Sequence, residues 1–214
     1  MTPWRLLSLL LDYPDEELLA CSGELAEAAR ALPSSPARKA ILSFLARREG
    51  LAANAIQREY VETFDFAKRA TLYLSFHAYG DRRQRGMAML HLKQSYRAAG
   101  FELGDGTLPD HLPAALEFTD LAPEAGIGVL RDFRPALEVV RAALHEEDSA
   151  YALLLDALCE LLPAASAEEL DDARRIAAEG PPSETVGLEP FAPPEAMPAA
   201  CGSGEPSSAG AILL

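Results

Sequence analysis

Residues 60–94 read YVETFDFAKRATLYLSFHAYGDRRQRGMAMLHLKQ, and the apolar positions of this stretch recur at helical spacing. Tyr60 and Phe64 are four residues apart and share a helix face, and Leu72, Phe76 and Tyr79 fall on one stripe of the next helix. No run alternates apolar and polar residues with β-branched enrichment, as a half-buried strand would. The stretch therefore predicts helices near 51–66, 69–79 and 82–99 and no sheet.

Helical spacing and helix-start signals continue on both sides of this stretch. Thr2–Pro3 and Ser35–Pro36 each place a capping hydroxyl before a proline at the first helical position. Ser166 and Glu169 have the spacing of a capping box. Further helices are predicted near 2–11, 15–32, 36–49, 110–121, 127–146, 149–162 and 167–179, with Pro135 splitting or kinking the one that contains it.

Length and composition divide the chain into two parts. A chain of 214 residues is typical of one domain with an appended segment. Residues 180–214 contain seven prolines and four glutamates but no lysine or arginine, a composition that cannot bury enough apolar surface to offset chain entropy. The sequence therefore predicts a single all-α, bundle-like domain of about ten helices over residues 1–179, followed by a disordered tail over 180–214.

Charge is distributed unevenly along the chain. The net charge is −14, but residues 55–100 carry eight Lys/Arg against four Asp/Glu. A strongly acidic chain argues against nucleic acid, which is bound by basic faces that displace counterions. An acidic surface also repels anionic lipid and attracts a basic segment of a partner protein. We expect no nucleic acid and no stable membrane association.

The sequence contains no recognisable catalytic or metal-binding motif. Cys21, Cys159 and Cys201 are odd in number and far apart, which favours reduced thiols in a cytoplasmic protein over a disulfide framework or a zinc site. None of the four histidines has an acidic residue three positions before it, as a di-iron helix would require. Neither a nucleophile elbow nor a phosphate-binding loop is present. We therefore expect no enzyme activity, no metal and no cofactor.

The aromatic stretch is the candidate binding surface. An aromatic stripe at helical spacing is most often core, but here charged residues flank it, and an apolar floor with a charged rim suits capture of a short amphipathic helix. We therefore predict that both floor and rim contact a partner peptide. The predicted contact residues are Tyr60, Phe64, Asp65, Leu72, Phe76, His77, Asp81, Arg82 and Arg85.

Two further candidates lie in the segment Pro109–Asp110–His111–Leu112–Pro113. In one interpretation this is only a helix start, opened by Pro109 and capped by Thr107 or Asp110. In the other, Asp110 holds His111 charged near neutral pH, and both residues lie on the rim of the binding surface. Spacing alone leaves the two interpretations open.

The stretch Tyr60–Leu90 resembles the signature of the respiratory nitrate reductase assembly chaperones, the delta-subunit or NarJ type, within a wider all-helical group dedicated to molybdoenzymes. The segments LLSLLLDYPDEEL (Leu6–Leu18) and TLPDHLPAALEF (Thr107–Phe118) resemble the same family in the same order. The resemblance covers about residues 4–165. The family usually has an acidic residue where this chain has Thr107, and Asp105 is the neighbour that would substitute for it.

The resemblance implies a function. Chaperones of this type bind the apo catalytic (alpha) subunit of nitrate reductase in the cytoplasm, chiefly through its N-terminal segment, which is short, amphipathic and often basic. They keep it competent for molybdenum cofactor insertion before membrane attachment, and the insertion machinery is a further candidate partner. The alternatives are a general helix-binding adaptor, a chaperone for another redox enzyme and, as a third class, a helical metalloenzyme.

Overall fold

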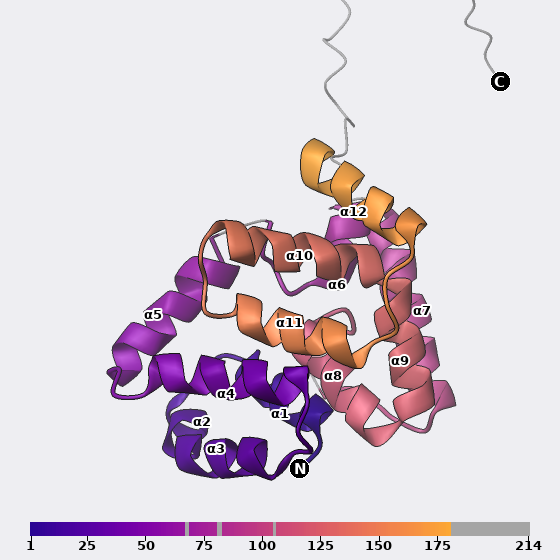
Figure 1. Ribbon diagram of the computed structural model, residues 1–214. Coiled ribbons are helices and arrows are strands. Elements are labelled where there is room, and N and C mark those ends of the chain that lie inside the picture. The colour runs from indigo at the N-terminus through magenta and orange to yellow at the C-terminus, as the bar shows by residue number, and fades with distance from the viewer. Residues whose placement is uncertain (67–68, 81–82, 105, 181–214) are drawn as a thin grey trace, which may run out of the picture. The chain divides into compact units, whose positions relative to one another are not determined.

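The computed structural model describes residues 1–66, 69–80, 83–104 and 106–180. This part of the chain forms helices joined by short loops and contains no strand, only one isolated β-bridge (Figure 1). The helices are α1 (Pro3–Leu10), α2 (Glu16–Ala20), α3 (Ser22–Ala31), α4 (Pro36–Arg48), α5 (Ala53–Phe64), α6 (Leu74–Tyr79), α7 (Arg83–Ala98), α8 (Leu112–Leu121), α9 (Pro123–Asp132), α10 (Arg134–Glu146), α11 (Ala152–Leu161) and α12 (Ala167–Glu179).

The predicted helix starts are confirmed at three places. The Thr2 hydroxyl accepts a hydrogen bond from the backbone N–H of Arg5, and Ser35 caps α4 in the same way. Ser166 and Glu169 form the reciprocal capping box of α12. Each cap satisfies a backbone donor that has no intrahelical partner, which contributes about 1 kcal/mol to helix stability.

The main core lies where the first and last thirds of the chain meet. Helices α10, α11 and α4 are layered, and α1 packs against both α8 and α11 (Figure 1). Leu6, Leu7 and Leu11 from the first helix and its end are fully buried, as is Tyr151 just before α11. Each buried leucine contributes roughly 1.5–3 kcal/mol relative to an exposed one, so this shared core holds the two ends of the domain together.

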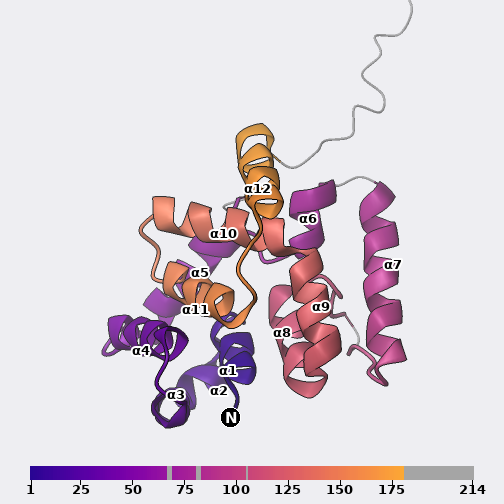
Figure 2. The same ribbon diagram turned by 45° about the vertical axis from the view of Figure 1, so that its right-hand side comes forward.

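A second, smaller core attaches α7. Leu92 and Tyr96 pack against Phe118 of α8 and Val129 of α9, and the Tyr96 hydroxyl donates to the carbonyl of Pro109 at 2.7 Å. Figure 2 shows α7 standing beside α9 at the edge of the helical array. Only Leu92 and Tyr96 are buried on this helix, so its other faces are free to meet solvent.

Some predicted helix boundaries are wrong for identifiable reasons. Residues 69–73 are not helical, because the backbone of Tyr73 pairs with that of His111 in the isolated bridge. The predicted helix over 127–146 is split beside Pro135, as expected, into two helices that meet at Phe133, but the first of them begins earlier than predicted, at Pro123. The predicted helix over 15–32 is also two. The described residues therefore hold twelve helices where the sequence predicted about ten.

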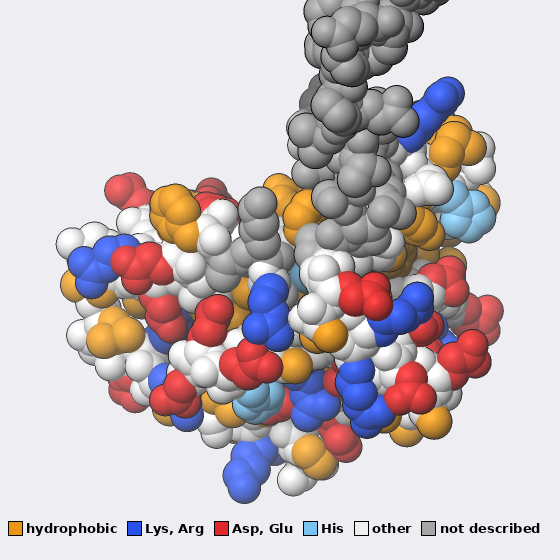
Figure 3. Space-filling view, turned by 90° about the horizontal axis from the view of Figure 1, so that it is seen from above, with side chains coloured by type: hydrophobic (Ala, Val, Ile, Leu, Met, Phe, Trp, Pro, Cys, Tyr) orange, Lys and Arg blue, Asp and Glu red, His pale blue; other side chains and the backbone are white. Residues whose placement is uncertain are grey.

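The surface seen from the α12 end mixes both signs of charge. Figure 3 shows Lys/Arg and Asp/Glu side chains interspersed there, with hydrophobic side chains between them. None of the helices that the structure describes combines the length and apolarity needed to cross a bilayer. The predicted tail lies, apart from Gly180, outside the described residues and stays a prediction.

Candidate partner-binding site

Two distant segments meet to form the candidate site. The backbone N–H of Leu74 donates to the carbonyl of Asp110, and the N–H of Leu112 donates to that of Leu72, both at 2.9 Å. These bonds frame the bridge between Tyr73 and His111. The segment before α6 is therefore fixed to the start of α8.

Asp110 fixes the side chains around this junction. Its carboxylate is buried and accepts hydrogen bonds from the Ser75 hydroxyl and from Arg85 Nη2, the latter at 3.2 Å. Arg85 Nε also donates to Ser75 Oγ at 3.1 Å. Asp110 therefore joins α6, α7 and the start of α8. It does not cap α8, which begins with His111 at its N-cap position and no side-chain cap.

Aromatic and cationic groups cover this buried ion pair. The Arg85 guanidinium carbon lies 5.9 Å from the ring centres of both Tyr73 and Phe76, within cation–π range. The Tyr73 ring packs on His111 with centres 5.2 Å apart, and 38% of Tyr73 is exposed. We name Tyr73, Phe76, Arg85 and His111 the α6–α8 patch. Partly exposed rings beside a guanidinium suit contact with a peptide that has apolar and polar side chains.

His111 is held in its neutral form. Burial lowers the pKa of His111, and the nearby carboxylates of Asp12 and Asp110 raise it by less. The interpretation in which Asp110 keeps this imidazole charged near neutral pH is therefore not favoured. His111 presents a flat, uncharged ring next to Tyr73.

His77 belongs to a different environment. It is 1% exposed, and its Nε2 lies 3.0 Å from the carbonyl of Thr71, which identifies Nε2–H as the donor. Burial lowers the pKa of His77. The ring lines a cavity of about 260 Å³ together with Phe133, Pro135 of α10 and Ile176 of α12, and it meets the Phe76 ring of the α6–α8 patch edge-on with centres 6.2 Å apart.

Three of the predicted contact residues are core. Tyr60 and Phe64 have ring centres 4.9 Å apart, and Phe64 meets Tyr151 edge-on at 4.7 Å. The Tyr60 hydroxyl donates to the carbonyl of Leu11 at 3.2 Å. Leu72 is 3% exposed. In this conformation these side chains support the surface from within and do not form its floor.

The remaining predicted residues have mixed outcomes. Asp65 is exposed at the C-cap of α5. Asp81 and Arg82 lie outside the described residues, as does Asp105. Thr107 is exposed, and its N–H donates to the carbonyl of Gly104 at 3.2 Å.

Some exposed apolar side chains were not predicted as contacts. Phe66 is 78% exposed, Met87 66% and Leu90 46%. Met87 and Leu90 are three residues apart and share a helix face with exposed Gln94, which is the signal that distinguishes them from buried Leu92 and Tyr96. Tyr73 was also missed, because its exposure depends on the bridge to His111.

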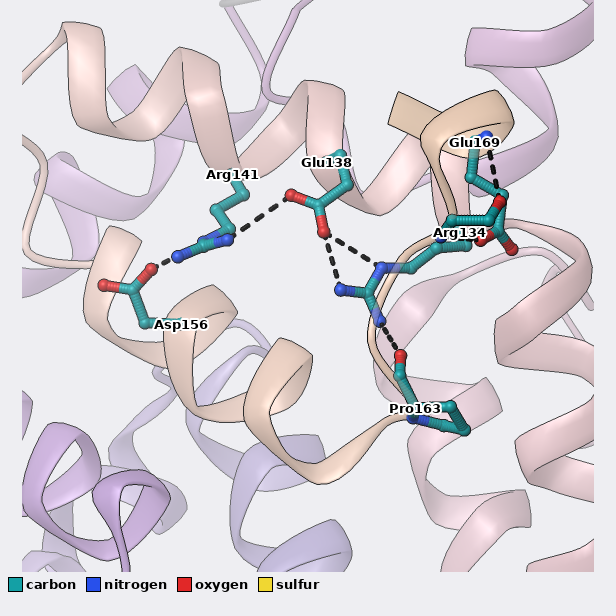
Figure 4. A network of polar contacts seen from close by, with 7 residues as sticks. Arg134, Glu138, Arg141, Asp156, Pro163 and Glu169 are labelled. Atoms are coloured by element: carbon teal, nitrogen blue, oxygen red, sulfur yellow. Dashed lines mark hydrogen bonds and ion pairs between the residues drawn. The ribbon is translucent and has the colours of Figure 1, made fainter. Parts of the chain in front are cut away.

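A separate polar network among α10, α11 and the loop into α12 is structural. Arg134 donates twice to Glu138 Oε1, at 2.9 and 2.7 Å, and once to the carbonyl of Pro163 at 2.8 Å (Figure 4). Arg141 contacts Glu138 Oε2 at 3.4 Å and Asp156 Oδ1 at 2.6 Å. The network ties α10 to α11 and to the loop that leads into α12.

The described ranges contain an unreactive buried thiol and no metal cluster. Burial raises the pKa of the Cys159 thiol to about 12, which leaves it protonated and inert at neutral pH. Within residues 1–66, 69–80, 83–104 and 106–180, no three His, Cys, Asp or Glu side chains gather closely enough to hold a metal ion.

Comparison with known proteins identifies the family. The family model for the nitrate reductase delta subunit matches residues 25–157. The protein from Bacillus subtilis (strain 168) named "Probable nitrate reductase molybdenum cofactor assembly chaperone NarJ" is 34% identical over 157 residues, which cover 73% of this chain and 85% of that protein. The nitrate reductase molybdenum cofactor assembly chaperone NarJ of Escherichia coli (strain K12) is 34% identical over 159 residues, or 73% and 67% of the two chains.

A solved structure agrees with this assignment. A crystal structure from Archaeoglobus fulgidus, of a protein named for redox enzyme maturation, matches 72% of this chain and 88% of its own, with a TM-score of 0.54 and 27% sequence identity. The matched family region, residues 25–157, includes the whole α6–α8 patch. The chain therefore belongs to the nitrate reductase delta subunit family, as the resemblance of its sequence segments predicts.

Proposed function

We propose that this protein is a dedicated cytoplasmic chaperone for a nitrate reductase. It binds the apo catalytic subunit, chiefly through that subunit's N-terminal segment, and keeps it open to molybdenum cofactor insertion before membrane attachment. The protein itself forms and breaks no bonds. The machinery that inserts the cofactor is a further partner in this proposal.

The observation that carries the proposal is family membership over residues 25–157. Both NarJ relatives are named as molybdenum cofactor assembly chaperones, and each is matched over two thirds of its length or more. The matched region contains α4 to α10 and most of α11, including every described member of the predicted contact set.

The α6–α8 patch is the surface that we assign to the client peptide. Phe76 and Tyr73 supply apolar contact area, Arg85 holds both rings through cation–π contacts, and His111 supplies a flat neutral face. Asp65 lies on the exposed rim. Tyr60, Phe64, Leu72, His77 and Asp110 act from beneath by holding these groups in place.

A peptide that folds on binding loses conformational entropy, which keeps its affinity moderate and its release easy. We therefore expect micromolar binding or better for a synthetic N-terminal peptide of the catalytic subunit, measured by calorimetry, and weaker binding as salt rises. The variant Phe76→Ser should weaken binding about tenfold. The exposed Leu121→Ser serves as a control, because it lies outside the patch and should leave binding unchanged.

The decisive experiment is co-purification with the apo catalytic subunit, with and without its N-terminal segment. Recovery that depends on the segment supports the proposal. Equal recovery of unrelated amphipathic helices would favour a general helix-binding adaptor. Failure to recover the apo subunit, together with unimpaired nitrate reductase maturation when this protein is absent, would rule out the chaperone function.

A further inference from the structure

Helix α7 presents a largely exposed outer face at the edge of the helical array (Figure 2). The residues that it buries are Leu92 and Tyr96, which pack toward α8 and α9. Arg85, on the same side of the helix, reaches Asp110. Because an α-helix rises about 1.5 Å per residue, the 16 residues of α7 offer roughly 24 Å of surface on the opposite side.

The outer face of α7 has the residue spacing of a coiled-coil seam. Its residues follow one another at alternating steps of four and three, namely Arg83, Met87, Leu90, Gln94 and Arg97. Such steps keep side chains on one side of a helix, where they can meet a second helix that packs alongside. All of them are exposed, Met87 by 66% and Leu90 by 46%. The face therefore presents an apolar centre with polar ends, in the spacing that suits helix pairing.

Positive charge is concentrated on this helix. Residues 82–101 contain five Lys/Arg and no Asp or Glu, in a chain whose net charge is −14. Lys93 and Arg97 are exposed and, unlike Arg85, form no ion pair with a carboxylate of the described residues. Lys93 follows Leu90 by three positions and Arg97 follows it by seven, so both cations lie beside the apolar centre of the face.

This charge distinguishes between three kinds of occupant. A second copy of the chain that packed its own α7 on this face in a two-fold pair would bring like charges together, because α7 has no acidic residue to oppose them. An anionic membrane would attract α7 but repel the rest of a chain with net charge −14. A short acidic helix has neither disadvantage, since it can place carboxylates beside Lys93 and Arg97 alone.

We propose that the outer face of α7 binds an acidic amphipathic helix of a partner protein. Leucine-type side chains of that helix pack on Met87 and Leu90, and its Asp or Glu side chains pair with Lys93 and Arg97. The charge of this partner is opposite to that of the basic client segment that the family resemblance implies, so the contact is a separate one. It does not depend on the proposed function.

The outer face and the α6–α8 patch use opposite sides of α7. Arg85 belongs to the patch and precedes Met87 by two positions and Leu90 by five. At 3.6 residues per turn, these offsets place Arg85 about 140–160° around the helix from both apolar residues. The two surfaces can therefore be occupied at once, which brings an acidic partner next to a bound client segment.

The test uses the full chain and a fluorescein-labelled model peptide of about 21 residues, three heptads with leucine at a and d and glutamate at e and g. The glutamates repel one another, which keeps the peptide from pairing with itself. Fluorescence anisotropy at low salt should detect binding, although the net charge of the chain opposes it. Leu90→Ser should weaken binding about tenfold, whereas Leu51→Ser, at a comparably exposed leucine (49%) between α4 and α5, should change it less than about twofold.

Two double variants separate local from overall charge. Lys93→Glu with Arg97→Glu reverses two exposed cations of α7, and Lys39→Glu with Arg47→Glu reverses two on α4. Each pair combines a lysine with an arginine of the last helical turn and changes the net charge equally. Only the α7 pair should weaken binding about tenfold beyond the general effect. Unchanged circular dichroism melts would show that the variants fold.

Three results of these measurements would overturn the inference. One is no binding of the acidic peptide at low salt. Another is equal weakening by the α7 and α4 double variants, which would show that no local charge is involved. The third is equally tight binding of a peptide with glutamine in place of glutamate.

Two further results would assign the face to another occupant and so also overturn the inference. One is self-association of the chain in analytical ultracentrifugation that Leu90→Ser abolishes, which would indicate a second copy. The other is binding to vesicles of phosphatidylcholine and phosphatidylglycerol that Lys93→Glu with Arg97→Glu abolishes, which would indicate a membrane. If any of these occurs while the client peptide still binds and depends on Phe76, the inference fails and the proposed function stands.

Discussion

Asp110 is the residue on which the α6–α8 patch depends most directly. Its buried carboxylate accepts hydrogen bonds from Ser75 and Arg85, and its own backbone carbonyl accepts from Leu74. Arg85 is in turn held against the rings of Tyr73 and Phe76. One carboxylate therefore sets the positions of groups on three elements.

Arg85→Met should lower the free energy of unfolding by about 3 kcal/mol, because it leaves the buried carboxylate of Asp110 without its cationic partner. Urea unfolding followed by circular dichroism measures the change. The control is Arg58→Met, which removes an exposed i, i+4 ion pair with Glu62 and should cost less than about 0.5 kcal/mol. If both variants lowered the free energy of unfolding by the same amount, the ion pair between Arg85 and Asp110 would stabilise the protein no more than an exposed pair does.

Acidification should destabilise the protein through His77 and His111, whose pKa values burial lowers below 6.5. As pH falls below about 6.5, the unfolded state takes up protons that the folded state does not, so stability decreases until the folded-state pKa is reached. The urea midpoint should therefore be lower at pH 5.5 than at pH 7.5. His77→Gln, which keeps a donor for the carbonyl of Thr71, should reduce this dependence. An unchanged dependence would exclude His77 as its source.

Asp156 has the opposite linkage at lower pH. Burial acts to raise its pKa, but hydrogen bonds from His145 and Arg141 outweigh this and lower it below 3.8. Its contribution to stability is present above pH 3.8 and is lost as pH falls from there through the lower folded-state pKa. The ion pair of Asp156 with Arg141, shown in Figure 4, therefore persists at the pH values at which His77 and His111 lower the stability.

At the scale of elements, helices α8 and α9 make an unusually close approach. A Cβ atom added to Gly126 of α9 would lie 2.4 Å from the Cα of Thr119 on α8. Both residues are buried, and the contact involves backbone that cannot move aside easily. Glycine at this position permits the close packing of α9 on α8.

Gly126→Ala should destabilise the protein by about 1–3 kcal/mol, because the two helices must move apart. Gly128→Ala in the same helix is the matched control. Its added methyl group meets no atom within 4 Å, so it should stabilise the helix by roughly 0.5–1 kcal/mol. Thermal melts of the two variants should shift in opposite directions, and shifts of the same sign would contradict this account.

The sequence predicted an element correctly where the interactions that form it join residues close together in the chain. Caps such as Thr2, Ser35 and Ser166 act within one turn, and all three are confirmed. The prediction that residues 69–73 are helical is wrong, because Tyr73 forms a backbone bridge to His111, 38 positions further along the chain, in place of intrahelical hydrogen bonds. A local pattern contains no information about such a distant partner.

The candidate site was only partly predictable for the same reason. The spacing correctly predicted that Tyr60 and Phe64 share one helix face. It did not indicate that this face is covered by Tyr151, the residue just before α11, whose ring contacts both of theirs. Spacing also identified Asp110 and His111, whereas their roles depend on Ser75, Arg85 and Asp12.

For the whole molecule, we propose that residues 1–179 are sufficient for the fold and that 180–214 form a disordered tail. Removing residues 181–214 should shift the melting temperature by less than about 2 °C, because their composition supports no core. Differential scanning calorimetry of full-length and truncated proteins measures this. A decrease of more than a few degrees would show that the apolar end, Ala211–Leu214, docks onto the domain.

The packing of α4 and α1 against α11 also has a consequence for biosynthesis. Helices α1 and α4 bury apolar side chains against a segment that is translated more than a hundred residues after them. Until then Leu6, Leu7 and Phe44 lack their final neighbours, and the nascent chain exposes apolar surface to the cell. A protein that protects an unfinished enzyme thus passes through its own vulnerable stage during translation.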